Sequence, residues 1–584
     1  MAIALLAALL PVAAGIGLAL TPVFRRGLRG PAAAFAIAVA IAVVFGDLFP
    51  HAVEHIGVGA LFWLGVGLFA PAVVERIAAR IRPGGSAGLH VGFLALCVHQ
   101  VVDGIQVGAG LTLQTGGWAI AGAVGAHSVP LVGAVTLGFA QRDGAPRALL
   151  RGAGLLVCTG IGVAIGDRGL GWFDALGWLP ALIGGLLLHV LWHDLWEAPP
   201  QGARGRSIEL GAFVLGGALP MAFMHFDEGE FSGALAELAV LAAPVLLLGL
   251  GASALVRALG TDLPGRPGLL RGAVSAALVP VNECSVLPRT ETLDKRGAAT
   301  GALLAFLLVT PALGLDTLLV SGALLGPELA LARLGLAVLL PIGAALVFLG
   351  PSATEHAESI PISRGSFQAR ARTALSEQLL HDGPWLVASL LFAAALQATL
   401  PDYSGEAHWF VVAIVVVLIA MPSFVPATAS IPVAFVLLHK GVAPWAVLTL
   451  LVVGPALNLA TMRYIGRRFG TRGTLAVMAF VAAVGGLSYA LAPAVVDPLA
   501  VDAIGLPALS ILGVLLLASA WRVGPRGWLA VLSDLGGPGS GHDHGHDHGH
   551  AHEHAHTHHG LGPVEAAHAG ELAHDHCHDH GEDP

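Results

Sequence analysis

Long segments that carry almost no charge constrain this chain more than any other feature. They include residues 32–45, 119–139, 238–255, 329–349 and 504–520. A helix needs about 20 apolar residues to cross about 30 Å of bilayer hydrocarbon. Only 11% of the residues are charged, against roughly a quarter in soluble domains, so the charge for several soluble surfaces is missing. The sequence therefore predicts an all-α, polytopic membrane protein.

Clusters of arginine predict an orientation in the membrane. Basic clusters begin at Arg25, Arg76, Arg142 and Arg204, and two apolar segments separate each consecutive pair. Cytoplasmic loops of membrane proteins carry an excess of Lys and Arg. We therefore expect eight spans in a first domain, residues 1–230, with the N-terminus outside. About fifteen crossings follow for the whole chain, with a cytoplasmic C-terminus, in the inner membrane of a bacterium.

The second half of the chain contains an internal repeat. Residues 287–315 and 431–459 share a starting Leu/Ile-Pro, a central basic residue followed by Gly, and a closing Pro-Ala-Leu-x-Leu. The offset is a constant 144 residues, as between Pro311 and Pro455. Such duplication is typical of secondary transporters. We predict a duplicated domain at 231–526, with repeats at about 234–350 and 378–492 and a last helix at 503–522. Residues 298–325 and 329–349 are each expected to cross the membrane once, and three crossings per repeat would make the second repeat inverted.

Two re-entrant or broken segments, ending at Pro288 and Pro432, are expected in this domain. Irregular backbone at membrane depth is tolerated where it lines a cavity. Glu283 stands in the first of these segments and suits a cation or proton coupling, although backbone N–H groups at a helix break could also satisfy a buried acid. The residues predicted to shape a permeation path are Gln100 of the first domain and Asn282, Glu283, Cys284, Pro288, Pro311, Pro432, Pro455 and Asn458 of the second.

The C-terminal residues 527–584 form a histidine-rich tail. Residues 541–559 read GHDHGHDHGHAHEHAHTHH, a composition that cannot bury a core and predicts disorder. Neutral imidazole is a good ligand for Zn, Ni, Co and Cu. Metal binding is therefore predicted, against the alternatives of an affinity tag or a low-complexity segment without a role. The first predicted ligands of the tail are His542, His544, His546 and His548.

Histidines and acids also occur inside the predicted spans of the first domain. His99 and Asp103 are four residues apart and so share one helical face. Ionisable groups within spans are costly and usually functional. A single histidine would be read as a satisfied core residue, but four spans contribute imidazole, which favours a shared metal path. The predicted ligands are His51, Glu54, His55, His99, Asp103, His127, His189, His193 and Asp194.

Three of these segments carry a resemblance to a known family. The run His99-Gln-Val-Val-Asp103-Gly104 resembles the His-Asn-x-x-(Asp/Glu)-Gly signature of ZIP-family metal transporters. The run 127–130, His-Ser-Val-Pro, resembles the start of that family's fifth-span signature, and 47–55 resembles its second span. The resemblance implies that His99, Asp103 and His127 line a divalent-metal site, with Gln100 nearby. Ser128 stands where the family usually has a stronger ligand.

The second half resembles another family. Residues 234–522 are similar to predicted bacterial permeases that include organoarsenical efflux permeases, through the runs 279–288, 295–297, 306–311 and 455–458. Members of that family tend to carry several cysteines before the first proline. Here Cys284 stands alone, with Glu283 beside it. The resemblance implies a permease, with a weakened soft-ligand site for arsenic.

Two functions remain open on this reading. The first is transport of a divalent metal ion, with Zn, Ni or Co favoured. The alternative is a permease for another solute, such as an organoarsenical, regulated by a metal-sensing ZIP-like domain. In either case the metal ion is a substrate or a regulator, the bilayer is a partner, a homodimer is possible and no nucleic acid is expected.

Catalysis is not expected from this sequence. Because no GxxxxGK[ST] loop occurs, use of ATP is not predicted. The run His51-Ala-Val-Glu54-His55 does match the His-x-x-Glu-His pattern of inverted zinc proteases. Pro50 precedes it, however, and no third acidic ligand follows at helical spacing.

Overall fold

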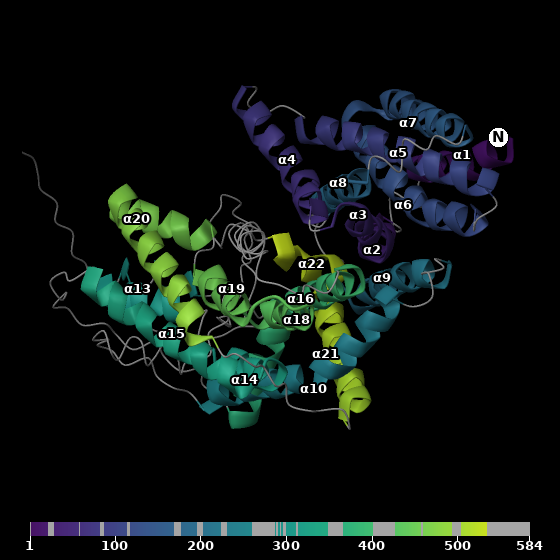
Figure 1. Ribbon diagram of the computed structural model, residues 1–584. Helices are drawn as coiled ribbons and strands as arrows, with labels where there is room; N and C mark the ends of the chain where they lie inside the picture. Colours follow the sequence, from purple (N-terminus) through teal and green to yellow (C-terminus); the bar gives the residue numbers. More distant parts are fainter. Residues whose placement is uncertain are drawn as a thin grey trace, which may run out of the picture. The chain divides into compact units, whose positions relative to one another are not determined.

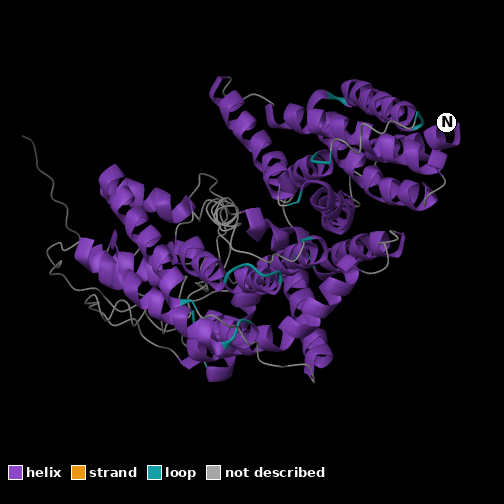
Figure 2. Ribbon diagram, in the orientation of Figure 1, coloured by secondary structure: helices purple, strands orange, loops and turns teal. Residues whose placement is uncertain are grey.

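A computed structural model gives an all-helical protein, with no strand among the residues that it describes (Figure 2). The prediction of an all-α chain is therefore confirmed for these residues. They are 2–21, 29–57, 59–81, 87–113, 117–168, 177–194, 202–223, 230–259, 286–287, 290–291, 294–295, 300–310, 314–347, 366–400, 427–456, 459–492 and 504–533.

The first domain contains the series of helices that the apolar runs predict. One of them is interrupted by a π-helical turn, η2 (Val44–Leu48), which continues into the next helix. The α-helices are α1 (Ala2–Leu20), α2 (Arg29–Val43), α3 (Phe49–Ile56), α4 (Gly59–Ile81), α5 (Ala87–Leu113), α6 (Gly117–Asp143), α7 (Ala145–Gly166), α8 (Leu179–Asp194) and α9 (Ala203–Phe223) (Figure 1).

Glycines allow pairs of these helices to approach backbone to backbone. A Cβ added to Gly162 of α7 would lie 2.0 Å from the carbonyl oxygen of Val101 in α5. A Cβ on Gly104 of α5 would lie 2.3 Å from the carbonyl oxygen of Thr159, and one on Gly185 of α8 would meet the backbone of α4 at 2.2 Å. Small residues at such crossings are typical of membrane helices, where close van der Waals packing drives association.

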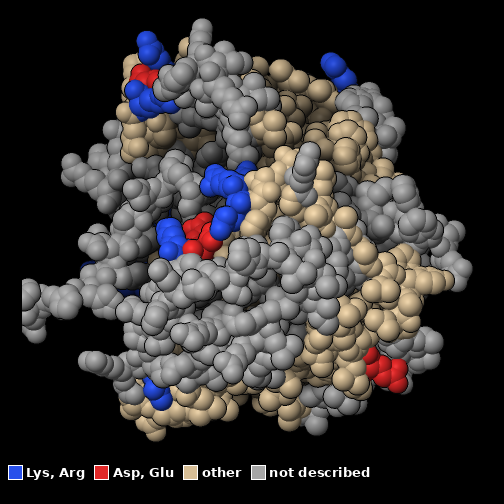
Figure 3. All heavy atoms as spheres, turned by 90° about the vertical axis from the view of Figure 1, so that its left-hand side faces the viewer, with Lys and Arg blue, Asp and Glu red and all other residues tan. Residues whose placement is uncertain are grey.

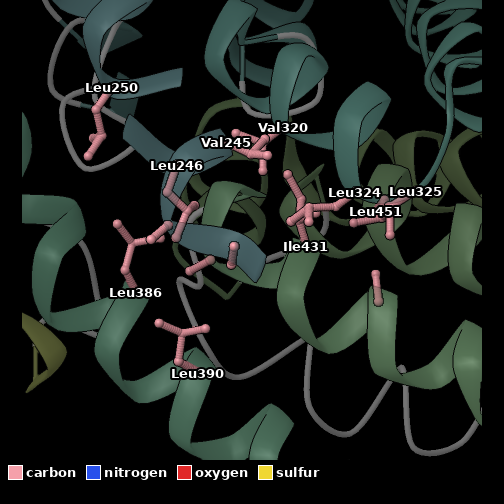
Figure 4. Close-up of a cluster of buried hydrophobic side chains, with 14 of the residues drawn as sticks. Val245, Leu246, Leu250, Val320, Leu324, Leu325, Leu386, Leu390, Ile431 and Leu451 are labelled. Atoms are coloured by element: carbon pink, nitrogen blue, oxygen red, sulfur yellow. The ribbon is translucent and has the colours of Figure 1, made fainter. Parts of the chain in front are cut away.

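The second half packs around an apolar core formed by several helices. Val245, Leu246 and Leu250 come from α10, and Val320 and Leu324 come from α14. Figure 4 shows these side chains together with residues of α16, α18 and α19. The helices are α10 (Glu230–Leu259), α13 (Thr300–Val309), α14 (Leu315–Leu324), α15 (Pro327–Val347), α16 (Phe367–Thr399), α18 (Ala427–His439), α19 (Pro444–Ala456), α20 (Leu459–Leu491), α21 (Gly505–Val523) and α22 (Pro525–Leu529). A short 3₁₀ turn, η7 (Ala530–Ser533), follows.

The helix bounds of this half recur at the offset seen in the sequence. Helices α13 and α19 begin 144 residues apart, and so do α14 and α20. Gly326, with φ 90°, separates α14 from α15, and Gly470, with φ 67°, kinks α20 at the matching position. Positive φ is readily adopted by glycine, so both copies use it at the same bend. The domain limits themselves stay a prediction.

Two expectations about this half differ from the structure. The single crossing expected over 298–325 is divided, because α13 and α14 have 10 residues each and Gly314 between them is not helical. A re-entrant or broken segment was expected to end at Pro432; the structure has no break there, because this proline lies inside α18, and the re-entrant alternative stays a prediction. Helices α18 and α19 have 13 residues each, or about 20 Å, and are too short to cross a bilayer singly.

Six helices among the described residues are long and apolar enough to cross a membrane. Exposed large apolar side chains lie along them, including Leu6, Leu10 and Val157. In Figure 3, the described charged side chains on the visible face gather in a few spots. The chain is thus a multi-pass membrane protein, while the count of fifteen crossings stays a prediction. The six are Ala2–Leu20, Gly30–Ile56, Ala145–Gly166, Phe231–Leu259, Phe367–Ala398 and Gly505–Val523.

The histidine-rich tail separates from the rest of the chain. Residues 541–584 form a unit distinct from residues 1–540. The predicted ligands His542, His544, His546 and His548 lie outside the described residues, so metal binding by the tail stays a prediction.

Candidate functional site

A buried polar network joins α5, α6 and α7 in the first domain. His99 Nε2 lies 3.2 Å from Asp103 Oδ2 on α5. Ser128 of α6 donates to the same carboxylate oxygen at 3.1 Å. Gln100 links Ser128 to α7. Its Nε2 lies 3.5 Å from Ser128 Oγ, and its Oε1 accepts a hydrogen bond from Thr159 Oγ1 of α7 at 2.9 Å. All five side chains are buried.

The packing of α5 on α7 explains why this network forms. The glycine contacts at Gly104 and Gly162 bring the two backbones together, which places Thr159 within reach of Gln100. Residues four apart face the same side of a helix, and this spacing aligns His99 with Asp103. The structure therefore brings together two predicted metal ligands, and adds Ser128 and Thr159, which the sequence reading did not include as ligands.

The other predicted ligands of the first domain do not join this network in the part of the chain that is described. His189 of α8 is buried, and its Nδ1 lies 3.0 Å from the carbonyl oxygen of Leu68. The side chains of His127, His193 and Asp194 lie outside the described residues. Their roles as metal ligands stay predictions.

His51, Glu54 and His55 lie on the exposed side of the short helix α3. The rings of His51 and His55 meet edge to face, with centroids 4.5 Å apart, and the helix ends at Gly57. Among the residues whose side chains are described, no three His, Cys, Asp or Glu residues form a group able to hold a metal ion. The roles of His51, Glu54 and His55 as metal ligands therefore stay predictions.

A second buried polar cluster lies in the other half, where α14, α16 and α18 meet. Asp316 stands in the first turn of α14 and is half-buried. Its Oδ2 lies 3.3 Å from Gln378 Nε2 of α16 and 3.4 Å from Thr428 Oγ1 of α18. Asp382 follows Gln378 by one helical turn and is hydrogen-bonded to it. We call Asp316, Gln378, Asp382 and Thr428 the carboxylate cluster.

The carboxylate cluster is largely buried, and an arginine acts on Asp316. Gln378, Asp382 and Thr428 are 1%, 6% and 5% exposed. Asp316 is attracted to Arg333 of α15, which is fully buried and donates to Ser321 Oγ at 2.7 Å. Ionisable groups at membrane depth carry a large desolvation cost and tend to mark substrate or ion paths.

Asp382 has one negatively charged and one positively charged neighbour. It is repelled by Asp316 and attracted to Arg257 of α10. That arginine is shared, because its Nη2 also forms an ion pair of 2.7 Å with Glu377, which is half-exposed. Two carboxylates in the cluster therefore repel each other, and each of them is attracted to an arginine of a neighbouring helix.

Sequence reasoning missed this cluster because its members are far apart along the chain. Gln378 lies 62 residues from Asp316, and only the packing of three helices brings them together. One local signal was present: Gln378 and Asp382 have the same four-residue spacing as His99 and Asp103, within a long apolar helix. That spacing could have identified α16 as a helix with a functional face.

The predicted permeation path is only partly described. Pro432 is buried in α18, one turn after Thr428. Pro455 lies in α19, but its side chain is outside the described set. Asn282, Glu283, Cys284, Pro288, Pro311 and Asn458 lie outside the described residues, and their roles stay predictions.

Comparison with known proteins identifies one half of the chain. Residues 235–491 match a family described as a predicted permease. No curated protein and no solved structure matches the chain significantly. The match contains every residue of the carboxylate cluster and supports the resemblance of this half to permeases. The His99–Asp103 network lies outside it, and nothing in these comparisons supports the ZIP-family resemblance of the first domain.

Proposed function

From the permease match of residues 235–491, we propose that this half of the chain is a secondary permease and that the carboxylate cluster lies on its transport path. The observation that supports this proposal is the position of Asp316 and Asp382, which are held close together where three helices meet. Burial of an acid within the membrane is unfavourable in free energy, and such acids are found mainly where they act on an ion or a substrate.

The helices around the cluster are short and discontinuous, as in transporters that work by alternating access. Helix α14 begins after the non-helical Gly314 and places Asp316 in its first turn. Helix α18, which carries Thr428, is a 13-residue helix followed by another of the same length. Transporters commonly build their binding sites from such discontinuous helices near the membrane midplane. The cluster thus lies at the first turns of two short helices, α14 and α18, beside α16.

The solute is proposed to be something other than a transition-metal ion. Zn, Ni and Co favour imidazole or thiolate ligands, whereas the described ligands of the carboxylate cluster are carboxylate, amide and hydroxyl oxygens. An organoarsenical remains the first solute to test, because the second half resembles permeases that export such compounds. The cluster would then supply the coupling for transport, and the solute would bind elsewhere on the path.

The experiment is flux through the full-length chain in proteoliposomes, with trivalent organoarsenicals, zinc, nickel and cobalt as separate solutes. Organoarsenical flux that is lost in Asp382→Asn would support the proposal. The matched control is Glu328→Gln, which removes an exposed carboxylate in the first turn of α15. Flux of metal ions alone, undiminished in Asp382→Asn, would overturn it in favour of transport by the first domain.

A second candidate function rests on the network of the first domain. We propose that His99 and Asp103 bind a divalent metal that regulates the permease half. Their 3.2 Å contact on one buried face supports this proposal, because imidazole and carboxylate together suit Zn, Ni and Co. Zinc should raise the unfolding temperature of the full chain through this site, and His99→Ala should reduce the rise. A rise of the same size in His99→Ala and in Asp103→Asn would refute the role of this pair.

The location of the protein is part of the proposal. The arginine clusters favour a bacterial inner membrane with the histidine-rich tail on the cytoplasmic side. In that position the tail would capture metal ions on the cytoplasmic side of the membrane. A protease-accessibility assay on sealed inside-out vesicles tests this orientation, since the tail should be cleaved there and protected in right-side-out vesicles.

A further inference from the structure

Two cysteine thiols contact each other where α5 packs on α7 in the first domain. Cys97 lies on α5 and Cys158 on α7, and both are free thiols that are half-buried. Their side chains are hydrogen-bonded to each other. A thiol is only a weak hydrogen-bond donor, so this contact contributes little to stability. Its consequence is chemical, because it places two oxidisable sulfur atoms side by side.

The register of the two helices supports this contact independently. Residues of α7 meet residues of α5 that stand 61 positions earlier in the chain, and the pairs recur at steps of four or eight residues. The glycine pairs of this row are Gly154 with Phe93, Gly162 with Val101 and Gly166 with Ile105. Cys158 and Cys97 have the same offset and lie one turn after the first of these pairs and one turn before the second. A Cβ on Gly162 would lie only 2.0 Å from its partner's carbonyl oxygen, so the backbones are close one turn from the thiols. A disulfide requires such an approach, because its two Cα atoms lie within about 7 Å.

The surroundings of the thiol pair favour an uncharged reagent over a metal ion. Exposed apolar side chains flank both cysteines along their helices: Leu94 and Val98 on α5, and Val157 and Ile161 on α7. Helix α7 is long and apolar enough to span the membrane, so these side chains would face lipid. Among the residues whose side chains are described, no third Cys, His, Asp or Glu completes a metal site with the pair, whereas a structural zinc site needs four ligands. A reagent dissolved in the bilayer reaches the pair without leaving water.

We propose that Cys97 and Cys158 are a redox modification site, at which a lipid-soluble hydroperoxide converts the two thiols into a reversible disulfide. The sulfur of one thiol takes the terminal oxygen of the hydroperoxide. The O–O bond breaks, an alcohol leaves with the thiol proton, and a sulfenic acid forms. The second sulfur then attacks the sulfenic sulfur, the S–S bond forms, and the hydroxyl group leaves as water with the second thiol proton. The two electrons lost by the sulfur atoms reduce the hydroperoxide.

The disulfide would form beside the buried polar network of the first domain. Thr159 follows Cys158 in the chain and donates to Gln100, which lies one turn after Cys97 on α5, at 2.9 Å. A covalent bond holds two sulfur atoms closer together than a hydrogen bond does, so oxidation draws α5 and α7 together next to this contact. Any effect on metal binding by the network rests on the proposed function, whereas formation of the disulfide does not.

The test is oxidation of the purified full-length chain in proteoliposomes with cumene hydroperoxide. Peptide mapping by mass spectrometry should find Cys97 linked to Cys158 within one chain, and dithiothreitol should remove the link. A background of Cys284→Ser with Cys577→Ser leaves only these two thiols and should give the same link. The matched control combines Cys97→Val with Val98→Cys, which keeps the number of thiols but moves one of them off the shared row. Its link should form at least about tenfold more slowly, because disulfide geometry is specific.

Each outcome decides the inference separately from the proposed function. Wild-type protein whose two cysteines stay reduced, oxidise singly to sulfinic or sulfonic acids, or link only between two chains overturns the inference. Equally fast linkage in the shifted control overturns it as well, because the contact in the row would then be irrelevant. Since the wild type alone can give the first of these results, a variant that fails to fold does not protect the inference. A reversible disulfide in a protein that carries no organoarsenical would overturn the proposed function and leave the redox site established.

Discussion

Removal of Arg526 should destabilise the protein strongly, because it is the counter-charge of a buried acid. Arg526 of α22 donates through Nε to Glu209 Oε1 of α9. Glu209 is fully buried and Arg526 is 4% exposed, so water screens the pair little. The other oxygen, Glu209 Oε2, has no hydrogen-bond partner within the described chain. Loss of one partner of such a pair typically costs about 3–5 kcal/mol, and we expect this loss for Arg526→Met.

The free energy of unfolding can be measured by titration of mixed micelles with a denaturing detergent, followed by tryptophan fluorescence. A double-mutant cycle with Glu209→Gln isolates the pair. The double variant should be less destabilised than the two single changes added together, since neither charge is then left alone. Arg522→Met is the matched control, because Arg522 is an exposed arginine four residues earlier, at the end of α21. An Arg526→Met variant within about 0.5 kcal/mol of wild type, as for ordinary surface changes, would refute the reasoning.

Two glycine substitutions test the backbone geometry in the same assay. Gly162→Ala should destabilise by about 1–3 kcal/mol through overpacking, since the new Cβ would lie 2.0 Å from a carbonyl oxygen of α5; Gly160→Ala, with nothing within 4 Å, should be neutral or stabilising. Gly326→Ala should cost about 1–2 kcal/mol because its φ is 90°, whereas Gly335→Ala meets open space in α15. Equal effects within either pair would contradict the geometry.

The helices of the first domain were accessible to prediction because local features decide them. Apolar runs, arginine clusters and glycines at close crossings are all visible along the chain. The four-residue spacing likewise predicted that His99 and Asp103 share a face, and the structure places them 3.2 Å apart. What the pair binds is a separate matter, because the identity of a ligand depends on groups from other helices.

The carboxylate cluster shows where such reading stops. The packing of α14, α16 and α18 brings together Asp316, Asp382 and Thr428. No single segment of the sequence predicts this packing. Proline was also a misleading guide, because α18 continues through Pro432. The non-helical residue before Asp316 is instead a glycine, Gly314, with φ −52° and ψ 136°.

Comparison of equivalent positions in the two repeats shows whether the buried acids are needed to form the helices. At the offset of 144 residues, Ala460 stands opposite Asp316 and Leu238 stands opposite Asp382. Helices α14 and α20 begin at matching positions although only one of them carries the acid. The acids are therefore not required to form or end these helices, and a buried carboxylate costs stability where an apolar residue would not. Because the same element forms with alanine in one copy and with aspartate in the other, the aspartate contributes something other than stability.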